Sequence, residues 1–177
     1  MNNQPADTIK ESILVVDDTP ANLRLLSQML SQEGYRVRAV TSGTRALASV
    51  QVSRPDLILL DVKMPEMNGI EVCEQLKADP KTRDIPIIFV SALDELEDKV
   101  QAFTAGGVDY ITKPFQFAEV LARAETHLAL RKLQEQLRDA NRKLQDANRR
   151  LERELALAGR VQASFLPSEF PSTPGWQ

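Results

Sequence analysis

The chain has 177 residues, with 22 lysines and arginines against 25 aspartates and glutamates, and a formal net charge of -3 at pH 7. This length is enough for one hydrophobic core and a smaller appendage, and the acidic balance gives no electrostatic reason to expect a nucleic-acid partner. One cysteine excludes an internal disulfide, and no signal segment or bilayer-length apolar run occurs, so we expect a cytoplasmic protein that does not bind membranes.

Residues 1–11 are polar and without pattern, which predicts a flexible leader. After them, short apolar runs alternate with stretches of helical periodicity. We expect strands over residues 13–16, 35–40, 57–60, 87–90 and 110–112. We expect helices from residue 20 to a stop at Gly34, over 44–52, 70–78 and 95–105, and from about 117 onward. This alternation predicts an α/β fold, a doubly wound five-stranded parallel sheet with helices on both faces.

Four of the predicted strands end on the residue types that a phosphate site needs. Asp17 and Asp18 follow the first strand, Asp61 the third, Ser91 the fourth and Lys113 the fifth. In open parallel sheets, functional groups gather beyond the carboxyl ends of the strands. We therefore expect three carboxylates, a hydroxyl and an ammonium to meet along one edge of the sheet.

Asp61, alone at the end of the central strand, is the candidate nucleophile, because a carboxylate can attack phosphorus and form an acyl phosphate. Together with Asp17 and Asp18 it can hold Mg²⁺, which prefers oxygen ligands and would screen the repulsion between two anions. Lys113 suits a phosphate oxygen, and Ser91 offers a hydroxyl donor. A true phosphohydrolase is an alternative, but it would need a second carboxylate for acid-base work beside Asp61.

The last predicted helix continues past the point where a compact domain would end it. Between Phe115 and Gly159 there is no glycine or proline. Leucines recur every seven residues, and a second row lies three residues after each: Leu130, Leu137, Leu144 and Leu151, then Leu133, Ala140 and Ala147. This pattern predicts a coiled coil that forms a homodimer over residues 129–160. We expect parallel pairing, because identical domains at one end would then carry identical outputs at the other.

The residues at the strand ends resemble the receiver domain of two-component response regulators, over roughly residues 12–130. The matching segments are residues 15–18, 60–65 with Gly69, 90–92 and 112–115. The resemblance implies a flavodoxin-like receiver domain at 12–128 with strand order 2-1-3-4-5. It also implies a histidine kinase or phosphotransfer protein as phosphoryl donor.

The same resemblance assigns roles to single residues. Asp61 would be the phosphoacceptor, and Mg²⁺ would be held by Asp17, Asp18, Asp61 and the backbone carbonyl of Lys63. Ser91 and Lys113 would contact the phosphoryl group, and Tyr110 falls where the family keeps its switching aromatic. By this reading the chain itself is not an enzyme, beyond slow loss of its own phosphoryl group.

The end of the chain carries a second resemblance. Residues 154–167 and 174–176 are similar to the entry segment of PPM-type serine/threonine phosphatase domains attached to bacterial receivers. Residues 161–177 would then begin an output domain that is missing here, and the full-length protein would be a protein phosphatase. A cyclase-type or other output stays open. A DNA-binding output is favoured less, because no recognition-helix pattern is present.

Overall fold

The computed structural model of the chain describes residues 11–92 and 96–165. The predicted leader up to residue 10, the predicted helix start at residue 95 and the end of the chain after residue 165 lie outside the described residues. The chain divides into two compact units, Met1–Lys132 and Leu133–Gln177. The domain boundaries given above stay predictions.

Within the described residues, the first unit forms a parallel sheet of five strands in the order β2-β1-β3-β4-β5. The strands are β1 (Ser12–Val16), β2 (Arg36–Val40), β3 (Leu57–Leu60), β4 (Ile87–Ser91) and β5 (Asp109–Thr112). The predicted fold class and strand order are confirmed. The register pairs Val16 with Leu60 and Ser91 with Thr112, so neighbouring strands end side by side.

The helices follow the strands in alternation. They are α1 (Pro20–Gln32), α2 (Gly43–Val52), α3 (Gly69–Ala78), α4 (Leu96–Thr104) and α5 (Phe117–Phe165). Helices α2 and α3 begin at glycines, one residue earlier than expected. The reason is capping: the Ser42 side chain accepts the Arg45 N–H, and Asn68 forms a reciprocal capping box with Glu71. Each cap places the following glycine in the first turn.

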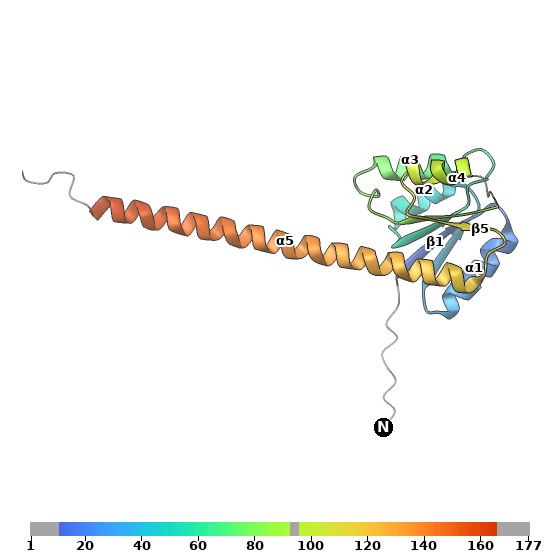
Figure 1. Cartoon of the computed structure of the whole chain (residues 1–177), viewed down its shortest axis with the longest axis horizontal. Coiled ribbons are helices and arrows are strands. Elements are labelled where there is room, and N and C mark those ends of the chain that lie inside the picture. The colour runs from blue at the N-terminus through green and yellow to red at the C-terminus, as the bar shows by residue number, and fades with distance from the viewer. Residues whose placement is uncertain (1–10, 93–95, 166–177) are drawn as a thin grey trace, which may run out of the picture. The chain divides into compact units, whose positions relative to one another are not determined.

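The sheet separates two hydrophobic cores, because successive side chains of a strand point to opposite faces. Leu14, Ile58 and Phe89 face α2, α3 and α4 on one side. Ile13, Leu59 and other residues one position along face α1 and the first part of α5 on the other side. Figure 1 shows these layers, with α2, α3 and α4 above the sheet and α1 below it. Both faces are covered, which explains why the strands read as continuous apolar runs.

Helix α5 is fixed to the amino-terminal edge of the sheet by charged side chains. Arg131 Nη1 donates to the backbone oxygens of Pro55 at 3.0 Å and Asp56 at 2.6 Å, just before β3. Arg123 Nη1 lies 2.7 Å from Asp109 Oδ1, and His127 Nε2 lies 3.1 Å from Asp109 Oδ2. Burial opposes the charge of Asp109, but these hydrogen bonds outweigh it and lower its pKa.

The face of α5 changes at the end of the first unit. Leu128 is 6% exposed and packs in the core, whereas Leu130 is 48% exposed. Along the second unit, Leu137, Leu144 and Leu151 of the first heptad row stay exposed, and so does Leu133 of the second row. Asp139 pairs with Arg142 Nη2 at 2.9 Å. In the described part of the chain, no helix has the length and apolarity to span a bilayer.

Candidate functional site

The sheet brings the predicted strand-end residues to one edge. Asp17 directly follows β1, Asp61 follows β3, and Lys113 follows β5. The backbone ladder continues one step beyond the strands, since Asp61 N donates to Val16 O at 2.8 Å and Lys113 N donates to Ser91 O at 2.8 Å. These bonds hold the backbone of Asp61 in register with the end of β1 and the backbone of Lys113 in register with the end of β4.

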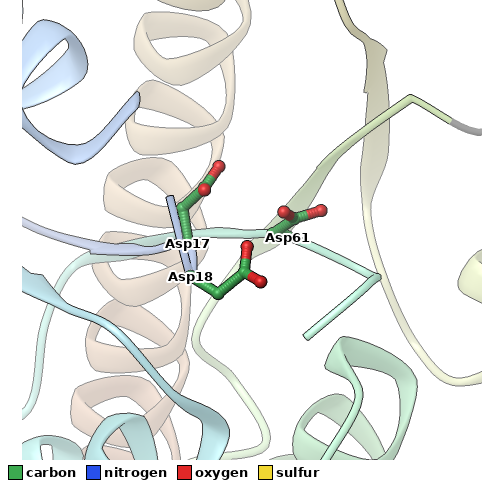
Figure 2. Close-up of side chains that lie close together, drawn as sticks. All are labelled: Asp17, Asp18 and Asp61. Carbon is green, nitrogen blue, oxygen red and sulfur yellow. The ribbon is translucent and has the colours of Figure 1, made fainter. Parts of the chain in front are cut away.

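Three carboxylates share a small volume at this edge. Asp17, Asp18 and Asp61 each offer an oxygen, and these oxygens lie within 4.8 Å of one another. Figure 2 shows the three side chains grouped around one space. Asp17 is 2% exposed and Asp61 is 5% exposed, whereas Asp18 lies at the surface. A donor set of carboxylate oxygens, half open to solvent, fits a hard cation such as Mg²⁺ that keeps part of its water shell.

Lys113 supplies the positive charge that the buried carboxylates need. Its Nζ lies 2.7 Å from Asp17 Oδ2 and 2.8 Å from Asp61 Oδ2. Burial opposes the charge on Lys113, but the hydrogen bonds to Asp17 and Asp61 outweigh it and raise the lysine pKa. For Asp61 burial dominates, and it raises the pKa of the carboxyl although Lys113 works in the other direction. Lys113 therefore stays charged and only partly offsets the cost of burying Asp61.

Ser91 presents a hydroxyl that has no hydrogen-bond partner among the described residues, although its Oγ is buried. Buried polar atoms of this kind are rare in native proteins and call for an explanation, such as a role in binding a ligand. Ser91 closes β4 beside Lys113, to which it is joined through the backbone. A group bearing acceptor oxygens near Lys113 would satisfy the hydroxyl.

Two contacts of Asp17 were not foreseen from the sequence. The Thr19 N–H donates to Asp17 Oδ1 at 2.8 Å, and Asn22 Nδ2 lies 3.1 Å from Oδ1 and 3.0 Å from Oδ2. The signal that could have revealed them is local. Pro20 opens α1 directly after the acidic pair, so Asn22 lies in the first turn of the helix and close to Asp17.

The loop after β3 shapes the remaining wall of the site. Lys63 N donates to Asp61 Oδ1 at 3.3 Å, and a hollow of about 500 Å³ beside the carboxylates is lined by Asp18, Lys63 and Asn68 among others. The role of the Lys63 backbone carbonyl as a metal ligand stays a prediction. Gly69 N donates to Val62 O at 2.8 Å and so closes this loop.

Gly69 leaves no room for a side chain. A Cβ at this position would overlap the backbone oxygen of Asp61 and approach Val62 Cα to 3.0 Å. We expect Gly69→Ala to lower the free energy of unfolding by about 1–3 kcal/mol, because backbone cannot yield as a flexible side chain can. Urea denaturation followed by circular dichroism measures this change. Glu74→Ala, an exposed change on the same helix, is the control, and equal stability of both variants would contradict the prediction.

Tyr110 lies on β5 within the core that contains Phe89, and its side chain is buried. The Lys99 ammonium lies 5.6 Å from the centre of its ring. The ring therefore points into the protein, and Tyr110 is two residues before Thr112, the backbone partner of Ser91. Its predicted role as a switch stays a prediction.

A family model described as response regulator receiver domain matches residues 13–125. Among curated proteins, response regulator PleD of Caulobacter vibrioides is 43% identical over 126 residues, which cover 71% of this chain and 28% of that protein. A probable cyclic di-GMP phosphodiesterase of Vibrio cholerae is 41% identical, with the same coverage. The DNA-binding response regulator MtrA of Mycolicibacterium smegmatis is 40% identical, over 69% of this chain and 52% of that protein.

Solved structures agree with the fold. A CheY-like response regulator receiver domain protein from Methanospirillum hungatei superposes with a TM-score of 0.67 at 30% identity, covering 70% of this chain and 98% of that one. The chain thus spans about a quarter to about half of the curated relatives named above, but nearly all of this structure. Residues 13–125, which the family model matches, contain all of the strand-end residues described above.

Proposed function

Because this chain belongs to the response regulator receiver domain family, we propose that Asp61 accepts a phosphoryl group from a phosphohistidine of a histidine kinase or phosphotransfer protein. The observation that carries this proposal is the pairing at the strand ends. The Lys113 ammonium bridges Asp17 and Asp61, and the buried Ser91 hydroxyl beside it lacks a partner in the described chain. An incoming phosphoryl group would provide acceptor oxygens for both Lys113 and Ser91.

The transfer is an in-line displacement at phosphorus. An Asp61 carboxylate oxygen attacks, the bond from phosphorus to the donor imidazole nitrogen breaks, and that nitrogen keeps the electron pair. Bound Mg²⁺ supplies charge neutralisation between the carboxylate and the phosphoryl oxygens. Asp17 and Asp18 would hold the ion together with Asp61. Lys113 Nζ holds Asp61 Oδ2 at 2.8 Å and Lys63 N donates to Asp61 Oδ1 at 3.3 Å, so the chain orients both oxygens of the carboxylate.

After transfer, Lys113 and Ser91 bind the product. The Lys113 ammonium, now 2.8 Å from Asp61 Oδ2, would contact a phosphoryl oxygen as a charge-assisted hydrogen bond. Ser91 would donate its hydroxyl to another oxygen. Movement of Ser91 toward the phosphoryl group would leave space for the ring of Tyr110, and this supports a role for Tyr110 in the switch.

We propose that the switch reaches an output through α5, as a parallel homodimer over residues 129–160. The exposed leucine row supports this, because a soluble monomer rarely exposes such a continuous apolar stripe.

For the output we favour a PPM-type serine/threonine phosphatase. A cyclase-type output or another output is the alternative, and the relatives include a probable cyclic di-GMP phosphodiesterase and a DNA-binding regulator. Cys73, a buried free thiol, is consistent with the cytoplasm.

Any coding sequence that follows residue 177 would discriminate between these outputs. Clustered metal-binding aspartates would support the phosphatase. A recognition-helix pattern would instead favour DNA binding, and neither result changes the assignment of Asp61.

Phosphoryl transfer is tested on the purified chain with acetyl phosphate and Mg²⁺. We expect intact-mass spectrometry to find one added phosphoryl group, and chelation of the metal with EDTA to prevent its addition. Generic phosphoesters should show no sustained turnover, which separates a phosphoacceptor from a phosphohydrolase. Absence of any added phosphoryl group with Mg²⁺ present would refute the proposed function.

A further inference from the structure

Asp17 is held by more hydrogen-bond donors than its neighbours in the site. Lys113 Nζ donates to Oδ2, the Thr19 backbone N–H donates to Oδ1, and the Asn22 amide lies within hydrogen-bond distance of both oxygens. At 2% exposure, Asp17 has almost no access to water that could take over these bonds. These protein groups therefore set the orientation of the Asp17 carboxylate, and with it the direction of the lone pairs that remain for a metal ion.

Asn22 differs from Lys113 in charge and in origin. Lys113 carries a positive charge and competes with a metal ion for Asp17 and Asp61, whereas an amide donates a hydrogen bond without cancelling the negative charge. Asn22 also comes from α1 and not from a strand end. Because its Nδ2 bridges the two oxygens at 3.1 and 3.0 Å, it restrains rotation of the carboxylate about its bond to the Cβ atom.

The start of α1 is built around this contact. Thr19 is the N-cap residue, but its side chain makes no capping bond, and the Asp17 carboxylate accepts the Thr19 N–H instead. Pro20 follows at the first helical position and fixes the backbone there. This leaves Asn22 one turn from the carboxylate, with its side chain on the side of the metal site.

We propose that Asn22 is a positioning residue for the metal site: it orients the Asp17 carboxylate for Mg²⁺ and so raises the affinity for the ion. The inference rests on the proposed function in taking the carboxylate cluster as a Mg²⁺ site. It assigns no contact between Asn22 and the metal or the phosphoryl group. Groups that hydrogen-bond to a metal ligand without touching the metal commonly contribute a factor of about 10 to 100 in metal affinity.

The test measures Mg²⁺ binding to the full chain by isothermal titration calorimetry, with no phosphoryl donor present. Asn22→Leu keeps the approximate shape and removes the donor, and Asn22→Ala removes the side chain. We expect the dissociation constant to rise about tenfold or more in both variants. Gln28→Ala, an exposed change on α1, is the matched control and should bind as the wild type does.

A second measurement separates positioning from folding. Urea denaturation without Mg²⁺ shows whether each variant is fully folded under the titration conditions, and a folded protein with weakened Mg²⁺ binding is the result that a purely structural role would not produce. Binding within twofold of wild type in a folded Asn22→Leu or Asn22→Ala protein would overturn the inference and leave the proposed function intact. A wild-type chain that binds no Mg²⁺ would instead refute the metal site itself, and with it both claims.

Discussion

Asp61→Asn is expected to abolish phosphoryl acceptance from acetyl phosphate. The amide has no negative charge to attack phosphorus and is a poorer ligand for Mg²⁺, so both parts of the transfer are lost. Asp17 does not replace it, because its carboxylate is already bound to Lys113, Thr19 and Asn22. Intact-mass spectrometry with Mg²⁺ present measures the loss.

The matched control for this variant is Asp139→Asn, which removes one carboxylate from the exposed surface of α5. It should accept one phosphoryl group as the wild type does. Peptide mapping of the wild-type product should place the phosphoryl group on Asp61. Undiminished phosphorylation of the Asp61→Asn protein would refute Asp61 as the acceptor and with it the assignment of the site.

The electrostatics of Asp61 fit the proposed Mg²⁺ site. Burial raises the pKa of Asp61 above the ordinary value of 3.8. The folded chain therefore binds this proton more tightly than the unfolded chain, and the contribution of Asp61 to stability falls as pH rises from 3.8 through the folded pKa. Above that window the ionised carboxylate destabilises the metal-free fold. If Mg²⁺ binds as proposed, it would relieve this cost and stabilise the ionised form of Asp61 that the proposed transfer needs.

The strand-end residues could be predicted because their pattern is local. Asp17, Asp61 and Ser91 each lie directly after a run of four apolar residues, and Lys113 follows a short strand. Parallel strands in one register bring such positions together. Convergence of Asp17, Asp61 and Lys113 follows from strand order alone. Ser91 is also placed by its strand, and its unpaired hydroxyl could not be read from the sequence, since pairing depends on every neighbour.

Other contacts depend on residues far apart in the chain. Arg131 reads as one more charge on a polar helix, yet it binds the backbone of Pro55, 76 positions earlier. His127 reads as one polar residue on a helix, yet its Nε2 lies 3.1 Å from Oδ2 of Asp109 at the start of β5. No periodicity connects such pairs. They depend on where the sheet places α5, so sequence patterns indicate the helix but not the contacts that hold it.

The exposed leucine row of α5 leads to the second large prediction. Leu137 is 63% exposed and Leu144 is 60% exposed, and both occupy the same heptad position. A second copy of the helix would cover them. We expect the double change Leu137→Asp and Leu144→Asp to convert the dimer to a monomer and to weaken association by about a hundredfold or more, because each copy would then bury two carboxylates.

Sedimentation equilibrium measures the loss of association. Gln145→Asp is the control, since it adds a charge next to Leu144 on the side of the helix away from the row. It should leave the dimer intact. Because the row lies on α5 and the acceptor lies on the sheet, the double variant should still accept one phosphoryl group. A wild-type chain that is monomeric at every accessible concentration would refute the dimer.

Disulfide crosslinking distinguishes a parallel from an antiparallel pair of α5 helices. In a parallel pair each leucine of the row faces its own copy, so Leu137→Cys and Leu151→Cys should each form a disulfide-linked dimer under mild oxidation. In an antiparallel pair at most one of these positions can face itself. Cys73 does not interfere, because burial raises the pKa of its thiol to about 11 and keeps it unreactive. Electrostatics also favour the parallel form. Lys143 and Arg150 flank the leucine row at the same heptad position and would face each other across an antiparallel pair.

Crosslinking at only one of positions 137 and 151 would contradict parallel pairing.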